Sequence, residues 1–205
     1  MQKQKILILF AHPKLEKSHV NLRLLEEIPK DNHITFHDLY ECYADFNIDA
    51  EREKELLLAH DIIIWQHPFY WYSCPPLLKQ WIDIVLEFGW AYGPEGTALK
   101  GKIIFNAITT GGSKEAYSHE GRNKYTIQEL LAPFNQTARL CHMIYLPPFA
   151  VQGTHRLSNE QLEKYSVQYK VLLEKLSNRD LDINKISSLN FLNEMCLSTI
   201  EELQK

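Results

Sequence analysis

The sequence predicts an α/β protein in which a doubly wound parallel sheet is covered by helices on both faces. Two observations lead to this prediction. Short apolar runs alternate five times with helical patterns along the chain, and the central runs are apolar at almost every position, as in strands buried on both faces. Because crossovers between parallel strands are right-handed, this alternation gives a doubly wound sheet. The 205 residues suffice for a domain with its own core.

The apolar runs have the length and composition of strands. The run ILILF and the run DIIIWQ are expected at the centre of the sheet, whereas HITFHDL alternates between polar and apolar residues and suits a position near an edge. The five expected strands are residues 6–10, 33–39, 61–66, 102–109 and 142–146.

Helical spacing of apolar residues occurs between these runs. The expected helices are residues 18–28, 50–59, 77–88, 126–131 and 158–176, with the fourth able to continue past Pro133. After Asn178, apolar residues fit one more amphipathic helix: Ile186, Leu189, Leu192, Met195 and Leu197. We therefore expect a sheet domain at residues 1–178 and a C-terminal helical extension at residues 179–205.

Composition and charge exclude several classes of function. A net charge of −4 and a pI near 6.1 argue against nucleic acid or an anionic membrane as the main partner.

The four cysteines are scattered without a C-x-x-C pair, which predicts reduced thiols in a cytoplasmic protein. No signal peptide or membrane span is expected. His33 and His37 are four residues apart but fall on an expected strand, so no metal site is expected.

Ligands of doubly wound sheets bind at the carboxyl ends of the strands. The first loop there, FAHPKLEKSHVNLRLL, leads into a helix whose free N–H groups and dipole favour an anion. Ser18 adds a hydroxyl, His12 an imidazole N–H, and Lys14 and Lys17 positive potential. Taken alone, the loop is equally explained as a capped helix after a turn at Pro13, and it has neither a G-x-G-x-x-G motif nor a P-loop.

The loops after the third and fourth strands carry different chemistry. Four rings, Phe69, Tyr70, Trp71 and Tyr72, precede two prolines that end the loop and start a helix. The third loop contains Thr109, Thr110, Gly111 and Gly112, whose glycines allow a flat ligand to approach the backbone, although a plain turn also explains them. An anion site, flat rings and backbone donors at one sheet edge together fit a phosphorylated ligand with a large aromatic ring system, such as flavin mononucleotide (FMN).

Six segments carry a resemblance to a known family: AHPKLEKSHVN, DLYECYADFNID, QHPFYWYSCPPLLKQWID, GWAYGPEGTALKGK, TTGGSKEAY and YLPPF. With these segments the chain resembles the flavodoxin-like NAD(P)H:quinone oxidoreductase family. Within it, the chain is most similar to bacterial general stress oxidoreductases and to ancillary subunits of glutathione-gated potassium efflux systems. The resemblance implies a flavodoxin-like five-stranded sheet of order 2-1-3-4-5, FMN as cofactor with FAD as the alternative, NAD(P)H as co-substrate, and a homodimer.

The resemblance also implies roles for individual residues. The flavin phosphate and nearby ribityl chain would be held by His12, Ser18, His19, Val20 and Asn21. The ribityl chain and the isoalloxazine edge would be wrapped by Phe69, Tyr70, Trp71 and Tyr72. The polar edge of the ring would meet Thr109, Thr110, Gly111 and Gly112, where backbone N–H groups stabilise developing negative charge. Tyr117 matches a family tyrosine that assists proton and charge transfer, so Tyr117, Gly111 and Gly112 are the expected catalytic groups.

One departure from the family pattern concerns proton transfer. Better-studied members have a histidine six positions after the tyrosine, and Asn123 stands there in this chain. His119 is closer to Tyr117 but out of register, so solvent or His119 is the expected proton source. The loop with Trp90 and Tyr92 is expected near the flavin of a partner subunit.

The activity implied by the resemblance is two-electron hydride transfer from NAD(P)H through flavin to a quinone or similar acceptor. An alternative is a regulatory ancillary subunit that contacts a potassium efflux transporter, because DLYECYADFNID and WQHPFYWYSCPPLL resemble that subfamily especially. A flavodoxin-type electron carrier is disfavoured, because the chain lacks a Thr-rich phosphate loop and a strongly acidic composition.

Overall fold

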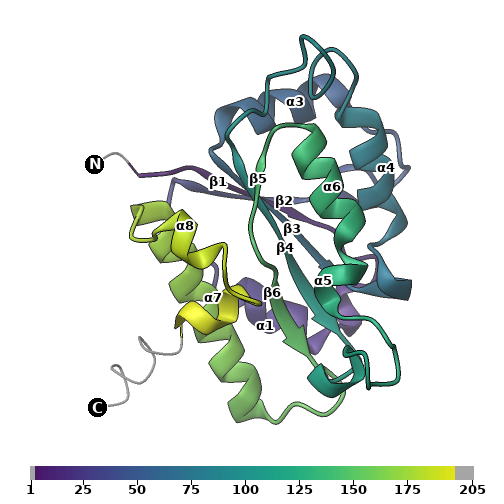
Figure 1. Cartoon of the computed structure of the whole chain (residues 1–205), viewed down its shortest axis with the longest axis vertical. Helices are drawn as coiled ribbons and strands as arrows, with labels where there is room; N and C mark the ends of the chain where they lie inside the picture. Colours follow the sequence, from purple (N-terminus) through teal and green to yellow (C-terminus); the bar gives the residue numbers. More distant parts are fainter. Residues whose placement is uncertain (1–2, 197–205) are drawn as a thin grey trace.

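The computed structural model describes residues 3–196, which form a parallel sheet between two layers of helices (Figure 1). The strands are β1 (Ile6–Phe10), β2 (Ile34–Asp38), β3 (Ile62–Pro68), β4 (Ile103–Thr110), β5 (Ile144–Tyr145) and β6 (Phe149–Gln152). Their order is β2-β1-β3-β4-β5, with β6 also paired to β4. The predicted doubly wound sheet of order 2-1-3-4-5 is confirmed, and the alternating run HITFHDL lies at the edge, as expected.

The fifth strand differs from the prediction of one strand at residues 142–146. The edge is divided into β5, which pairs with Ile103 and Ile104, and β6, which pairs with the last four residues of β4. Pro147 and Pro148 separate the two pieces because proline has no N–H to donate and restricts its own φ. The sheet therefore has six strands rather than five, and its last carboxyl end lies at Gln152.

Two hydrophobic clusters fill the space on either side of the sheet. Alternate residues of β1 point to opposite faces, so Leu7 and Leu9 join one cluster while Ile6 and Ile8 join the other. The first cluster is covered by α3 (Ala50–Ala59), α4 (Pro76–Val85) and α6 (Ala132–Leu140), and the second by α1 (His19–Glu26) and α7 (Asn159–Asn178) (Figure 1). Both faces of the sheet are thus buried, as the uniformly apolar strands predicted.

Short elements connect these layers at the carboxyl edge. They are η1 (Leu15–Lys17), α2 (Leu39–Cys42), η2 (Tyr70–Tyr72), η3 (Lys114–Ala116) and α5 (Ile127–Leu130). The expected helix at 126–131 is α5. Thr126 is its N-cap and forms a capping box with Glu129. The chain then continues directly into α6, with Pro133 in its first turn. No helix of the described residues is both long and apolar enough to cross a bilayer.

The segment after α7 packs on the sheet domain. Instead of the one amphipathic helix expected there, it forms α8 (Ile183–Ile186) and the 3-10 helix η4 (Leu192–Cys196), and Leu197 lies outside the described residues. Ile186 and Leu192 are buried in the same cluster as α1 and α7. The Asn193 side chain accepts a hydrogen bond from the Ala150 N–H at 2.9 Å, which joins η4 to β6.

Candidate functional site

A cavity of about 410 Å³ opens at the carboxyl ends of the central strands. It lies beside the ends of β1 and β3, and the order of the sheet reverses between these two neighbouring strands. Ligands of such folds bind at this position. The residues that line it are His12, Lys14, Lys17, Ser18, His19, Val20, Asn21, Pro68, Phe69, Tyr70, Thr109, Gly111, Thr154 and His155. All five residues predicted for the phosphate end of a flavin lie together in this wall.

One end of the cavity is suited to an anion. Ser18 is the N-cap of α1, and its Oγ accepts the Asn21 N–H at 3.3 Å. Within the described chain, the N–H groups of His19 and Val20 in the first turn have no hydrogen-bond acceptor. Lys14 and Lys17 also line this end. Free donors, a helix dipole and two ammonium groups together match the needs of a phosphate group.

His12 faces the same end of the cavity as a neutral donor. The Lys14 N–H donates to His12 Nδ1 at 3.2 Å, which leaves the proton of the neutral ring on Nε2. Burial lowers the pKa of His12, against smaller opposing effects of Glu16 and a backbone hydrogen bond. The imidazole can therefore donate one hydrogen bond at neutral pH without adding charge.

Asn21 connects the phosphate end to the fourth strand. Its Nδ2 donates to Ser18 Oγ at 2.9 Å and to Thr109 Oγ1 at 3.1 Å, and the residue is almost fully buried. Its Oδ1 is also buried but has no hydrogen-bond partner in the described part of the protein. Buried polar atoms are rarely left unpaired, and the hydroxyl groups of a polyol chain would supply the missing donor. This observation fits a ribityl chain beside Asn21.

Beyond β4, bare backbone faces the cavity. A Cβ atom on Gly111 would lie 2.8 Å from His155 Nε2, and one on Gly112 would lie 2.9 Å from Tyr117 Cε2, so a side chain at either position would collide with a neighbouring ring. Thr110 Oγ1 donates to the Gly112 carbonyl at 2.8 Å and fixes the turn. The N–H groups of Gly111 and Gly112 have no acceptor among residues 3–196, but only Gly111 lines the cavity, whereas the expected contact residue Gly112 lies beside it.

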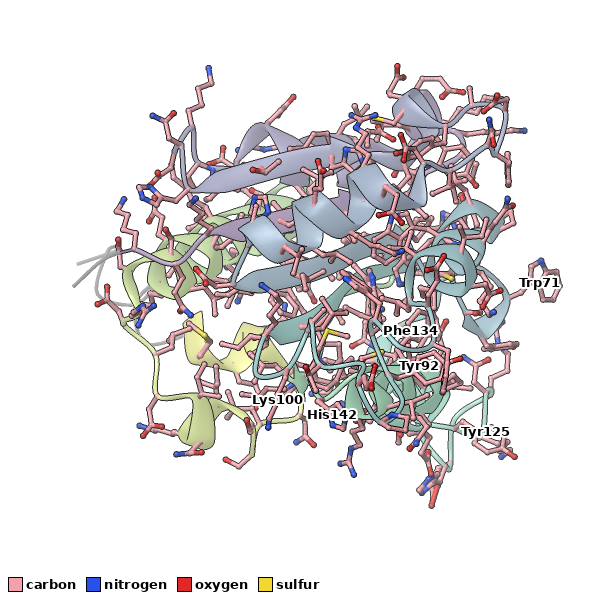
Figure 2. All side chains as sticks on the ribbon, turned by 90° about the horizontal axis from the view of Figure 1, so that it is seen from above. Trp71, Tyr92, Lys100, Tyr125, Phe134 and His142 are labelled. Atoms are coloured by element: carbon pink, nitrogen blue, oxygen red, sulfur yellow. The ribbon has the colours of Figure 1, made fainter. Side chains whose placement is uncertain are left out.

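The four predicted rings divide into two pairs. Phe69 and Tyr70 line the cavity, whereas Trp71 is 92% exposed and projects away from the body of the protein (Figure 2). Trp71 and Tyr72 both have positive φ, 48° and 62°, and this left-handed turn directs their side chains away from the cavity wall. The Tyr72 hydroxyl donates instead to Asn123 Oδ1 at 3.3 Å.

Tyr117 lies beside the cavity rather than in its wall. Its ring contacts Phe69 edge-on, with 6.0 Å between ring centroids. Burial raises the pKa of the Tyr117 phenol, so the hydroxyl keeps its proton at neutral pH. His119 is turned toward α5, with Nε2 3.0 Å from both carboxylate oxygens of Glu129.

Three cavity residues were not predicted: Pro68, Thr154 and His155. Thr154 and His155 follow β6, and the Thr154 N–H donates to the Thr110 carbonyl at 3.0 Å. Because the fifth strand is predicted to end at residue 146, the prediction includes no loop at the carboxyl edge after Gln152. The apolar run at residues 149–151 after the two prolines was the available signal.

A second cavity, of about 450 Å³, lies between β6, α7 and η4. Lys114, Gln152 and Lys164 contribute polar groups to its wall. It includes Leu157 and Gln161 at the start of α7, whose N-cap is Ser158, and none of its lining residues comes from β1 or β3. The cavity of about 410 Å³ is therefore the candidate site.

The fold and the cavity define a class: a doubly wound α/β protein with a cavity suited to an anion at the reversal point of its sheet. Comparison with known families makes the class specific, because residues 4–173 match the family described as having a flavodoxin-like fold. The chain belongs to this flavodoxin-like family.

Two curated relatives show the range of names within this group. The chain is 44% identical over 169 residues to the "Uncharacterized NAD(P)H oxidoreductase YdeQ" of Bacillus subtilis, an alignment covering 82% of this chain and 86% of that protein. It is 45% identical over 168 residues to the "Glutathione-regulated potassium-efflux system ancillary protein KefG" of Serratia proteamaculans, covering 82% and 92%.

Two solved structures are also similar to this chain. General stress protein 14 of Treponema denticola, crystallised in complex with FMN, has 38% identity and a TM-score of 0.80, with 84% of this chain and 99% of that chain covered. An NADPH-quinone reductase from P. pentosaceus has 35% identity and a TM-score of 0.74, with 81% and 95% covered.

Proposed function

We propose that the protein is an FMN-dependent NAD(P)H:quinone oxidoreductase. Relatives at 35–44% identity carry the names NAD(P)H oxidoreductase and NADPH-quinone reductase, and a neighbour at 38% identity was crystallised with FMN. The observation in this chain that carries the proposal is the cavity at the carboxyl edge, where free helix N–H groups, the unpaired Asn21 oxygen and the bare Gly111 backbone lie together.

These residues fit the three parts of FMN. The N–H groups of His19 and Val20 with the Ser18 hydroxyl would hold the phosphate, with His12, Lys14 and Lys17 around it. Asn21 would meet the ribityl hydroxyls, and the N–H groups of Gly111 and Gly112 would meet the polar edge of the ring. When bound, the flavin supplies the hydride chemistry between the nicotinamide and the acceptor.

Tyr117 is proposed to hold a proton beside the ring. Its hydroxyl stays neutral at physiological pH because burial raises the pKa of the phenol. Asn123 has no titratable proton and accepts the Tyr72 hydroxyl, and His119 is directed at Glu129 rather than at Tyr117. Solvent is then the source from which Tyr117 would be reprotonated.

The acceptor test is direct. FMN-reconstituted protein is mixed anaerobically with NADH or NADPH, and loss of flavin absorbance is followed; menadione is then added. We expect bleaching by at least one nicotinamide and recovery of the oxidised spectrum with the quinone. Flavin that binds but is not bleached by either nicotinamide would contradict the enzymatic proposal, while leaving the flavin site intact.

A homodimer is proposed from large aromatic side chains that the described structure leaves exposed. Trp71 is 92% exposed and Phe88 is 70% exposed, and rings of this size stabilise interfaces when buried. Replacing Trp71 with alanine is expected to weaken self-association in sedimentation velocity, whereas replacing the exposed Tyr125 serves as a control. A wild-type chain that sediments as a monomer at all concentrations would contradict the dimer.

A second candidate function is regulation of a potassium efflux transporter, favoured by the 45% identity to a protein named as an ancillary component of such a system. Co-purification with a membrane transporter from the native host, and loss of potassium efflux on deletion, would support it. We also propose a cytoplasmic location, because Cys42, Cys74 and Cys141 form no disulfide with one another, as is usual in that compartment.

A further inference from the structure

A buried chain of polar groups ends at an exposed cysteine on the opposite edge of the sheet from β5 and β6. Cys42 is the last residue of α2, and its Sγ lies 3.7 Å from Nδ1 of His37 on β2. His37 is buried, and its Nε2 lies 2.8 Å from Glu53 Oε1 on α3. The order thiol, imidazole, carboxylate is the arrangement that activates nucleophilic cysteines.

Glu53 is held in its ionised form at the end of this chain. The residue is fully buried, and it accepts the Tyr43 hydroxyl at 2.6 Å and the Trp81 indole N–H at 2.8 Å besides the His37 contact. Burial acts to raise the pKa of Glu53, but the hydrogen bonds from His37, Tyr43 and Trp81 outweigh it and the pKa is lowered. An ionised Glu53 requires a donor on Nε2 of His37.

The protonation of His37 follows from this requirement. With Nε2–H directed at Glu53, Nδ1 of the neutral ring carries a lone pair, and it faces the Cys42 thiol. The imidazole can take the thiol proton, and the buried carboxylate stabilises the imidazolium that forms. Arg52 lies nearby, with its guanidinium carbon 6.0 Å from the centroid of the Tyr43 ring, and its pKa is raised by Tyr43 and, to a smaller extent, by Cys42.

From this geometry we propose that Cys42 is a reactive thiol that forms mixed disulfides with small exposed disulfides, at a site independent of the flavin cavity. His37 Nδ1 takes the thiol proton, and the Cys42 sulfur attacks one sulfur of the small disulfide. That S–S bond breaks, a new bond to Cys42 forms, and the leaving thiolate takes the proton from His37. One disulfide and one thiol are consumed, and one mixed disulfide and one thiol are produced.

Cys74 and Cys141 provide internal comparisons. Burial raises the pKa of the Cys74 thiol to about 11 and that of the Cys141 thiol to about 11. Among the described residues, neither thiol has a series of imidazole and carboxylate groups like that beside Cys42. Both are expected to react slowly in the folded protein. The proposal therefore predicts that Cys42 reacts faster than Cys74 and Cys141, which peptide mapping can resolve.

The test uses dithiobis(nitrobenzoic acid) as the disulfide, with quenched samples mapped by mass spectrometry to follow each cysteine. At the same pH, Cys42 is expected to react at least roughly tenfold faster in the folded protein than in the urea-unfolded chain, after correction with N-acetylcysteine in the same solvents. A folded-state rate equal to or below the unfolded rate would overturn the proposal without any variant.

Variants then assign the base. In folded His37→Gln the Cys42 rate should fall roughly tenfold or more, whereas His33→Gln, which changes a half-exposed histidine near the start of β2, should leave it unchanged. Arg52→Gln alters an exposed side chain and should lower the rate by about threefold. A folded His37→Gln protein that reacts at the wild-type rate would show that His37 is not the base.

Discussion

Asn21 Nδ2 donates a hydrogen bond to Thr109 Oγ1 at 3.1 Å, joining the first helix to the end of the fourth strand across 88 residues of sequence. The same Nδ2 contacts Ser18 Oγ at 2.9 Å. One amide thus fixes the two loops that bound the cavity relative to each other. Its free Oδ1 is the atom expected to receive a ligand hydroxyl.

Replacing Asn21 with alanine should therefore weaken FMN binding through both lost positioning and a lost contact. We expect the Kd for FMN to rise by roughly tenfold, since a buried hydrogen bond of this kind contributes about 1–3 kcal/mol. Quenching of flavin fluorescence measures the affinity. Asn32→Ala, at an exposed position outside the cavity, should leave the Kd unchanged; equal losses in both variants would argue against the role given to Asn21.

Ser18 and Ser158 offer a matched pair of helix caps. Each accepts the backbone N–H three residues later, at 3.3 Å for Ser18 and 3.2 Å for Ser158, but only Ser18 lines the cavity. Alanine at either position should lower the free energy of unfolding by about 1 kcal/mol. Only Ser18→Ala should also weaken FMN binding. Chemical denaturation and FMN titration of both variants separate the two effects, and unchanged affinity in Ser18→Ala would place the phosphate elsewhere.

Tyr117→Phe keeps the ring that packs on Phe69 and removes the hydroxyl. We expect the rate of nicotinamide-dependent flavin reduction or quinone turnover to fall by about tenfold or more, with FMN affinity within roughly twofold of wild type. Stopped-flow absorbance measures both half-reactions. Tyr125→Phe, which alters an exposed tyrosine, is the control. A Tyr117→Phe enzyme with full rates in both half-reactions would remove the proton role from Tyr117.

The buried histidine His67 should make stability depend on pH. Its Nε2 accepts the Asn106 amide at 3.0 Å and its Nδ1–H donates to the Pro68 carbonyl at 3.0 Å, so the neutral ring satisfies both partners. Burial lowers the pKa of His67 to about 4, against about 6.5 in the unfolded chain. The unfolded state therefore binds more protons between these values, and stability is full above pH 6.5 and falls as the pH drops toward 4.

The expected loss from His67 over this interval is up to about 3 kcal/mol in the free energy of unfolding. Burial also lowers the pKa of His12 and the pKa of His60, which adds loss of the same sign. Urea denaturation at a series of pH values tests the effect. His67→Gln should be less stable at neutral pH but should lose less stability on acidification, whereas the exposed-site variant His142→Gln should follow the wild-type pH profile.

Much of the architecture was predictable because the strongest signals are local. Uniformly apolar runs such as Ile6–Phe10 require burial on both faces, and that requirement fixes a layered parallel sheet. The break between β5 and β6 was missed because an edge strand interrupted by two prolines has only weak periodicity on each side. Because the break was not predicted, the loop that carries Thr154 and His155 was not predicted either.

The site was predictable as a set of loops but not as a surface. The phosphate residues come from one contiguous loop, so sequence proximity sufficed to group them. The aromatic run could not be divided in the same way, because Trp71 and Tyr72 have a positive φ, which their residue types do not indicate. The contact of Cys42 with His37 likewise depends on how α2 turns back onto β2.

We propose that the cavity at the carboxyl edge holds one FMN per chain. The most direct test is the absorbance spectrum of protein saturated with FMN and freed of excess, with the released cofactor identified by mass spectrometry. We predict a flavin spectrum with one FMN per chain, and a stoichiometry or affinity that collapses in Asn21→Ala with Ser18→Ala while the fold is retained. A folded protein that stays colourless after incubation with FMN, or that binds it equally well with both residues replaced, would contradict the account.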